Sequence, residues 1–301
     1  MNPIVRGIGA APAGLYSDSR RNFVPLLPAM PLRLVYQAET SVPVECDSLT
    51  PDALRELSAA EVERIEVFHG NQKQSLADFF SVSGNADDER IELEGDLSGV
   101  HWIGTKMTTG TIHATGDVGR HLGSEMTGGE IHVEGDAGDW VGGEMHGGLI
   151  HVRGRAGHLI GAAYRGSKRG MTGGTILIHG TTGNEIGQTM RSGRVSVAGC
   201  GDFPALNMIA GTVLVFGPCG IRPAAGMRRG TLGLFGGDAP ALLPTFRPGS
   251  RDRPLAVVLL LRELARLGYP VPNELAGAEY QMFHGDQVAT GRGEILVADS
   301  H

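Results

Sequence analysis

The nineteen residues from Ile131 to Leu149, IHVEGDAGDWVGGEMHGGL, form a unit that recurs along the middle of the chain. The unit opens with an apolar-x-apolar triplet, passes through two glycine-containing steps and ends with Met-x-x-Gly. The triplet begins at Ile91, Ile112, Ile131, Ile150, Ile176, Val195, Val213 and Leu232, with steps of 21, 19, 19, 26, 19, 18 and 19 residues. Repeats of this length are typical of solenoids, in which each repeat forms one coil and packs against its neighbours.

Glycine and methionine follow the same period. Glycine accounts for 47 of the 301 residues, and 36 of the 47 lie between Gly95 and Gly237. Seven of the ten methionines open a Met-x-x-Gly motif, at Met107, Met126, Met145, Met171, Met190, Met208 and Met227. We expect the closing glycines to form corners with φ > 0. Ile131 and Val133 should point inward with the methionines, and His132 outward. The pattern predicts a mainly β fold, a single-stranded parallel β-helix of seven or eight coils with about 19 residues per coil.

The flanks divide the chain into four predicted segments. Residues 1–29 are an unstructured extension or a misassigned start, with Met30 as the alternative first residue. Residues 30–90 form an α/β cap, with strands in LRLVY and VPVEC and a short helix from Thr50-Pro51-Asp52 through Leu57. Residues 91–237 form the β-helix, and 238–301 form a C-terminal helix, PLAVVLLLRELARLG, and a tail. Both flanks are expected to cover the open ends of the solenoid.

Composition argues against membrane and secreted classes. The chain is 41% hydrophobic with 26 basic and 33 acidic residues, and its longest aliphatic run, Leu255 to Leu261, is seven residues long. A membrane span needs about 20. Three cysteines without a Cys-x-x-Cys motif favour a reducing compartment. We therefore expect a cytoplasmic protein without a signal peptide or membrane anchor.

The sequence offers few candidates for catalysis or metal binding. It has no Gly-x-Ser-x-Gly, His-Glu-x-x-His or dinucleotide-binding motif. His113, His132 and His151 fall in one outward position on successive coils, and we interpret them as neutral stacked imidazoles because parallel side chains do not converge on a metal. Cys200 and Cys219 occupy equivalent turns and are interpreted as small corner residues, with a reactive thiol as the alternative. No catalytic residue and no metal site are predicted.

Charge changes sign along the repeats. Residues 87–144 contain 13 acidic and 3 basic residues, whereas residues 150–230 contain 2 acidic and 10 basic residues. Arg165, Lys168 and Arg169 lie in the one long insertion, and Arg191 and Arg228 each follow a repeat methionine. These five cations are the predicted binding residues, for a polyanion or an acidic protein face, and a merely solvated face is the alternative. Nucleic acid is disfavoured because the chain is acidic overall.

The repeats from Ile91 to Gly237, followed by YQMFHGD (280–286) and GRGEIL (291–296), resemble the C subunit of the formylmethanofuran dehydrogenase family. They resemble more specifically the C subunit of the bacterial formyltransferase/hydrolase complex. The repeat itself is shared with the C-terminal GXGXG domain of glutamate synthase, but the chain lacks the amidotransferase and flavin-barrel regions. The resemblance covers the chain from about Met30 onward and leaves residues 1–29 without a counterpart.

The resemblance implies a right-handed β-helix that acts as a non-catalytic scaffold in a hetero-oligomer with the sibling A, B and D subunits. The pathway would be tetrahydromethanopterin-linked C1 metabolism. It also implies a methanofuran-type cofactor with a glutamate chain, which the five cations could hold. Molybdenum or tungsten pterin and iron–sulfur clusters would belong to partner subunits of an archaeal-type dehydrogenase, which is the alternative assignment. A second alternative, an autonomous β-helix enzyme such as a polysaccharide lyase, needs clustered carboxylates on one face.

Overall fold

The computed structural model describes residues 30–236 and 239–298. Residues 1–29, for which an extension or a misassigned start is predicted, lie outside the described residues, as do 237–238 and 299–301. The last residue of the predicted solenoid, Gly237, is among them.

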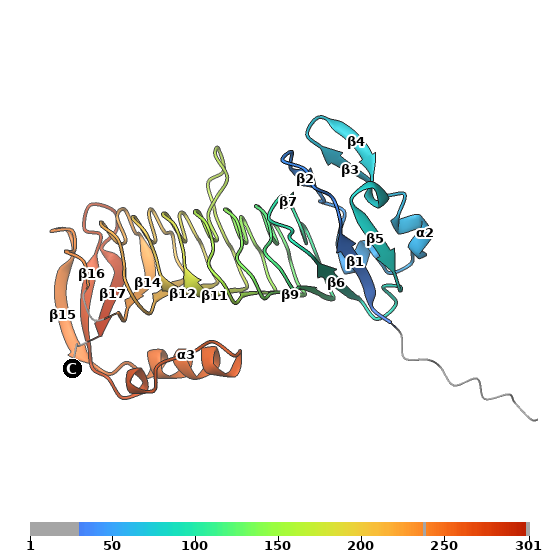
Figure 1. Ribbon diagram of the computed structural model, residues 1–301. Coiled ribbons are helices and arrows are strands. Elements are labelled where there is room, and N and C mark those ends of the chain that lie inside the picture. The colour runs from blue at the N-terminus through green and yellow to red at the C-terminus, as the bar shows by residue number, and fades with distance from the viewer. Residues whose placement is uncertain (1–29, 237–238, 299–301) are drawn as a thin grey trace, which may run out of the picture.

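The centre of the fold is a stack of short parallel strands, one from each repeat. Ile112 lies opposite Ile131, and Ile131 lies opposite Ile150. Figure 1 shows the intervening chain returning in successive coils along one axis. The strands are β6 (Arg90–Glu94), β8 (Thr111–Ala114), β9 (Glu130–Val133), β10 (Leu149–Val152), β11 (Thr175–Thr181), β12 (Arg194–Gly199), β13 (Thr212–Val215) and β14 (Arg229–Leu234). They form the middle of a 13-stranded sheet, which confirms a mainly β fold with one large parallel sheet.

Side chains alternate between the inside of the stack and its outer face. Ile131 and Val133 are fully buried, and His132 between them is partly exposed, as the triplet pattern predicted. The seven methionines of the Met-x-x-Gly motifs are also fully buried. They form an internal row of flexible side chains that fills the core along the axis.

The glycine that closes each Met-x-x-Gly motif has a left-handed backbone conformation. φ is +82° at Gly129 and +89° at Gly148, and it is positive at the equivalent glycines of the other coils. A Cβ atom at Gly148 would lie 2.7 Å from the carbonyl oxygen of Gly129. These corners therefore require glycine both for the backbone conformation and for the close approach of neighbouring coils.

The residues before the stack cap its first coil. β1 (Leu32–Tyr36) pairs in parallel with β6, and β5 (Phe80–Ser83) pairs antiparallel with β1. A second sheet has the order β4–β3–β2–β7. Its strands are β2 (Val44–Glu45), β3 (Glu66–His69), β4 (Gln72–Ser75) and β7 (Val100–His101), and the turn η1 (Leu76–Asp78) follows β4. The cap continues the main sheet and covers its first parallel strand.

The predicted helix after Thr50 is shorter than expected. α1 (Pro51–Leu54) starts as predicted, and Thr50 Oγ1 accepts a hydrogen bond from the Ala53 N–H at 3.3 Å. The chain does not continue helical to Leu57, because Ser58 starts a second helix, α2 (Ala59–Val62), through a capping box with Glu61.

The C-terminal tail adds three strands to the main sheet. β17 (Arg292–Ala298) pairs in parallel with β14, and β16 (Tyr280–Gly285) and β15 (Arg247–Asp252) follow it antiparallel. The two tail motifs of the sequence, YQMFHGD and GRGEIL, supply most of β16 and β17. The tail, preceded by the turn η2 (Asn273–Ala276), thus covers the C-terminal end of the stack.

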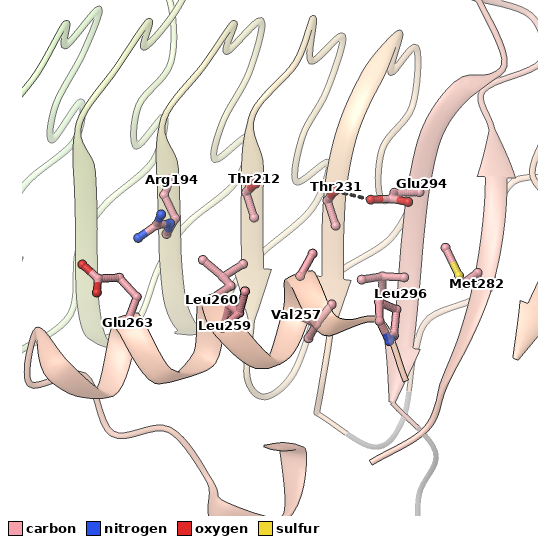
Figure 2. A pocket seen from close by; sticks show the side chains of 12 residues that line it. Arg194, Thr212, Thr231, Val257, Leu259, Leu260, Glu263, Met282, Glu294 and Leu296 are labelled. Carbon is pink, nitrogen blue, oxygen red and sulfur yellow. Dashed lines mark hydrogen bonds between the residues drawn. The ribbon is translucent and has the colours of Figure 1, made fainter. Parts of the chain in front are cut away.

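Helix α3 (Leu255–Arg266) lies along the outer face of the stack, where the sequence predicted an apolar helix (Figure 1). Leu261 and Leu264 are buried against outward-facing side chains of the sheet such as Leu177 and Leu214. A groove of about 410 Å³ remains between α3 and the sheet, with Arg194 and Glu263 at one end (Figure 2). None of the helices in the described ranges is long and apolar enough to cross a membrane.

Candidate basic groove

The long insertion of the repeat forms a loop, residues 162–170, that rises above the neighbouring corners (yellow-green in Figure 1). Tyr164 fixes its base. The Tyr164 hydroxyl lies 2.9 Å from His121 Nδ1 and 2.7 Å from Ser124 Oγ, and the Tyr164 N–H donates to Glu144 Oε1 at 2.9 Å. The loop is therefore held to two preceding coils at a defined place.

Aromatic rings surround this anchor. Trp102 stacks on His121 with 3.9 Å between ring centroids, and Trp140 stacks on Tyr164 at 5.9 Å. Burial lowers the pKa of His121 to about 4 and raises the pKa of Tyr164 to about 12. The hydrogen-bonded pair is therefore neutral at neutral pH, and the loop is anchored without an ion pair.

A basic groove of about 610 Å³ lies beside the loop. Arg169 comes from the loop, Arg191 follows a repeat methionine, and Arg229 begins β14. The remaining lining residues are His146, Thr172, Ser192 and Ala210. Within the described residues, none of the three guanidinium groups is paired with a carboxylate. The groove therefore presents unpaired positive charge from three separate segments to solvent.

The structure brings together only part of the predicted cation set. Arg169 and Arg191 line the groove, whereas Arg165 lines a neighbouring cavity of about 260 Å³ with Trp140 and Tyr164. Lys168 is exposed on the loop and lines neither of these two cavities. Arg228 is exposed but is not among the groove residues, and its carbonyl oxygen accepts a hydrogen bond from the Thr290 hydroxyl.

Five groove residues lie outside the predicted cation set, and two of them, His146 and Arg229, have basic side chains. His146 follows Met145 in the position that Arg191 occupies after Met190, so the repeat alignment contained this signal. Arg229 lies one position later in its own repeat, and no spacing rule distinguishes it from Arg228.

The predicted histidine row is present in the structure. His113, His132 and His151 do share one outward position on neighbouring strands. His113 lies between two carboxylates, with its Nδ1 2.8 Å from Glu92 and its Nε2 3.4 Å from Glu134. Burial lowers the pKa of His113, but these two carboxylates outweigh burial and raise it overall. The rings of His132 and His151 are tilted by 47° with centroids 6.0 Å apart.

Within the described ranges, no group of three or more His, Cys, Asp or Glu side chains is arranged to hold a metal ion. Cys200 and Cys219 occupy equivalent turns, as predicted. Their backbones form an isolated parallel β-bridge, and their Sγ atoms lie 3.8 Å apart.

Comparisons with known proteins agree with this architecture. The GXGXG motif family matches residues 99–239. The C subunit of the molybdenum-containing formylmethanofuran dehydrogenase 1 of Methanothermobacter marburgensis is 41% identical over 90 residues, which is 30% of this chain and 22% of that protein. The C subunit of the tungsten-containing formylmethanofuran dehydrogenase 2 of Methanothermobacter wolfeii is 38% identical over 93 residues, 30% of this chain and 34% of that protein. The aligned segment thus spans about a third or less of these two relatives.

A solved structure matches over a much longer region. It is a chain of the formyltransferase/hydrolase complex (FhcABCD) from Methylorubrum extorquens, crystallised in complex with methylofuran. The TM-score is 0.83 at 33% sequence identity, and the match covers 89% of this chain and 100% of the other. The chain therefore belongs to the family that includes the formylmethanofuran dehydrogenase C subunits and this chain of the formyltransferase/hydrolase complex.

Proposed function

We propose that this chain is the non-catalytic scaffold subunit of a formyltransferase/hydrolase complex in tetrahydromethanopterin-linked C1 metabolism. It assembles with the sibling A, B and D subunits, which carry the reacting groups. The match over the full length of a chain from such a complex supports this assignment. The stack itself is a single-stranded right-handed β-helix, because crossovers between parallel strands of one sheet are right-handed in almost all proteins.

The basic groove holds the acidic tail of a methanofuran-type cofactor in this proposal. The observation that carries it is the convergence of Arg169, Arg191 and Arg229 on one groove without carboxylate partners. A single exposed ion pair contributes only about 0–1 kcal/mol. Several pairs formed with one tethered polyanion add up, since each contact after the first is intramolecular. A run of glutamates, but not a lone carboxylate, can use all three arginines.

A triple variant of the groove tests the proposal: Arg169→Ser, Arg191→Ser and Arg229→Ser combined in one chain. In the assembled complex it should weaken binding of a glutamylated methanofuran more than binding of the same cofactor without its glutamate chain. The difference should shrink as salt approaches about 1 M, where the Debye length is about 3 Å. The matched control replaces by Ser three exposed arginines outside the groove that have no carboxylate partner among the described residues, Arg90, Arg247 and Arg262.

Two results would contradict the tail-binding proposal. One is an equal loss of affinity for both cofactor forms. The other is failure of the triple variant to assemble while residual complex binds the cofactor normally. Failure to assemble would identify the groove as a surface for a sibling subunit. The loop of residues 162–170, which Tyr164 anchors, also suits that role.

The redox dehydrogenase is the second candidate, because the matching curated relatives include molybdenum- and tungsten-containing enzymes. Purification of the native complex, followed by mass spectrometry of its subunits, separates the two assignments. Recovery of a pterin-binding subunit with molybdenum or tungsten would favour the dehydrogenase.

The isolated chain should show no formyltransferase, hydrolase or dehydrogenase turnover. Activity that is abolished by one substitution in this chain would overturn the scaffold role.

A further inference from the structure

Cys200 and Cys219 are the last two members of a row of equivalent corner residues, one from each coil, that runs through the whole stack. The N–H of each row residue donates to a carbonyl oxygen in the next coil, that of the residue just before the next member of the row. The row comprises Leu97, Val118, Ala137, Ala156, Thr182, Cys200 and Cys219. Its first five members are at most 9% exposed, whereas both cysteines are half-buried. The row is therefore less buried at its two cysteines than elsewhere.

The backbone holds the two cysteines in register. The Cys200 N–H donates to the Pro218 carbonyl at 2.9 Å, and the Gly220 N–H donates to the Cys200 carbonyl at 3.1 Å. Directly paired residues of neighbouring strands lie about 4.8 Å apart, inside the range of about 4.4–6.8 Å between the Cα atoms of disulfides. The Sγ atoms are 3.8 Å apart. Rotation of the side chains can close this gap without separating the coils.

The two thiols differ in acidity. The Cys200 S–H donates toward Cys219 Sγ, and this hydrogen bond lowers the pKa of Cys219. The same bond, together with burial, raises the pKa of Cys200. Cys219 therefore ionises first and is the attacking thiolate, while Cys200 remains protonated beside it.

We propose that Cys200 and Cys219 form a reversible dithiol–disulfide site that reacts with low-molecular-weight disulfides and, when oxidised, cross-links two adjacent coils. The Cys219 thiolate attacks one sulfur of the small disulfide. The S–S bond of the oxidant breaks, and its other half leaves as a thiolate that takes up a proton. Cys200 then loses its proton and attacks Cys219 Sγ, which releases the second half. The protein loses two electrons and two protons, and the oxidant becomes two thiols.

The cross-link joins the turn after β12 to the turn after β13. Each coil of the stack contacts only its neighbours, so opening from the C-terminal end must separate these two coils before it can proceed further. The disulfide should oppose this separation and raise the melting temperature of the whole chain.

Oxidised glutathione and intact-mass measurement on the reduced, full-length chain test the site. The chain has three cysteines, and the third, Cys46, is fully buried with its pKa raised by burial. We expect two of the three thiols to disappear, the mass to fall by two hydrogen atoms, and Tm to rise by several degrees. Dithiothreitol should reverse all three changes.

Two serine variants distinguish the roles of the thiols. Cys200→Ser should accumulate one glutathione on Cys219, since no second thiol can release it. Cys219→Ser should leave Cys200 unmodified under the same conditions. A wild-type chain that keeps three thiols, retains bound glutathione as Cys200→Ser does, or forms disulfide-linked dimers would overturn the proposal.

Discussion

His151 and His179 lie with their Nε2 atoms 2.6 Å apart on the outer face of the stack, next to Tyr269 in the segment that follows α3. At this distance one nitrogen carries a proton and the other accepts it. Burial lowers the pKa of His151 to about 4, and the charges of Arg153 and His179 act in the same direction. Burial also lowers the pKa of His179. The pair is therefore neutral at neutral pH and helps to seal the C-terminal segment onto the sheet.

The first prediction is that acidification weakens this contact. In the unfolded chain His151 takes up a proton near pH 6.5, whereas in the folded chain it resists protonation down to about pH 4. Its contribution to stability is complete above pH 6.5 and declines as the pH falls toward 4. His132 and Glu134 also face the ring, and Glu134 acts in the opposite direction by raising the pKa. The measurement is Tm between pH 7 and about 4.

His151→Leu is the matched variant for this prediction. Leu177 is fully buried in the equivalent position of the next strand, so a leucine fits this site. The decrease of Tm with falling pH should be shallower in the variant than in the wild type. Identical slopes would mean that the buried imidazole does not set the acid sensitivity.

The second prediction concerns the coil corners. Gly129→Val and Gly148→Val force a β-branched residue into φ near +82° and +89°, and the new Cβ would lie within 3 Å of a backbone oxygen in both cases. Strain of this kind costs about 1–3 kcal/mol at each site before any clash is counted. Soluble yield and Tm should both fall. Gly99→Ala is the control, because a Cβ there meets nothing within 4 Å. Wild-type behaviour of both valine variants would refute the corner assignment.

The third prediction concerns the anchor of the basic loop. Tyr164→Phe removes the hydroxyl that bonds to His121 and Ser124 and leaves the fully buried Ser124 hydroxyl without this partner. A buried polar group without a partner costs about 1–3 kcal/mol. Trypsin should then cleave faster at Arg165, Lys168 and Arg169. Tyr36→Phe, the same change at a tyrosine of β1 outside the loop, should leave the cleavage rate unchanged. Equal rates for all three proteins would place the anchor elsewhere.

The fourth prediction concerns residues 1–29. The segment has no repeat and no apolar period, and Met30 follows it directly. A chain that starts at Met30 should keep the Tm of the full-length chain and its ability to assemble with sibling subunits. Loss of assembly on truncation would identify the segment as a functional arm.

The repeat spacing predicted the stack because its main constraints are local. Inward triplets, the internal methionine row and glycine corners all follow from residue type and position within one coil, and the structure confirms each of them. The sequence did not reveal that Trp140 and Glu144 also have positive φ. A left-handed conformation outside glycine depends on hydrogen bonds between coils, such as that from the Glu144 N–H to the Ala162 carbonyl at 3.1 Å.

The basic groove could be predicted only in part for the same reason. The repeat aligned Arg191 with other residues that follow a methionine, but the path of the insertion decides that Arg169 faces the groove and Lys168 does not. That path depends on Tyr164, which contacts His121 across 43 residues of sequence. The strands of the tail were missed because β16 and β17 pair with each other and with β14 instead of following the repeat.

Ile131 pairs in register with Ile150, and the residues beside them pair in the same way, so each coil presents the same pairing pattern to the coil before it and the coil after it. Duplication of one nineteen-residue segment in the gene would insert a coil without disturbing the pairing above or below it. Each added coil would move the N-terminal cap away from the C-terminal strands by about 4.8 Å. The distance between the two ends of the molecule can thus change during evolution in steps of one coil. The surfaces at the two ends can then contact partners of different size while their own sequences stay the same.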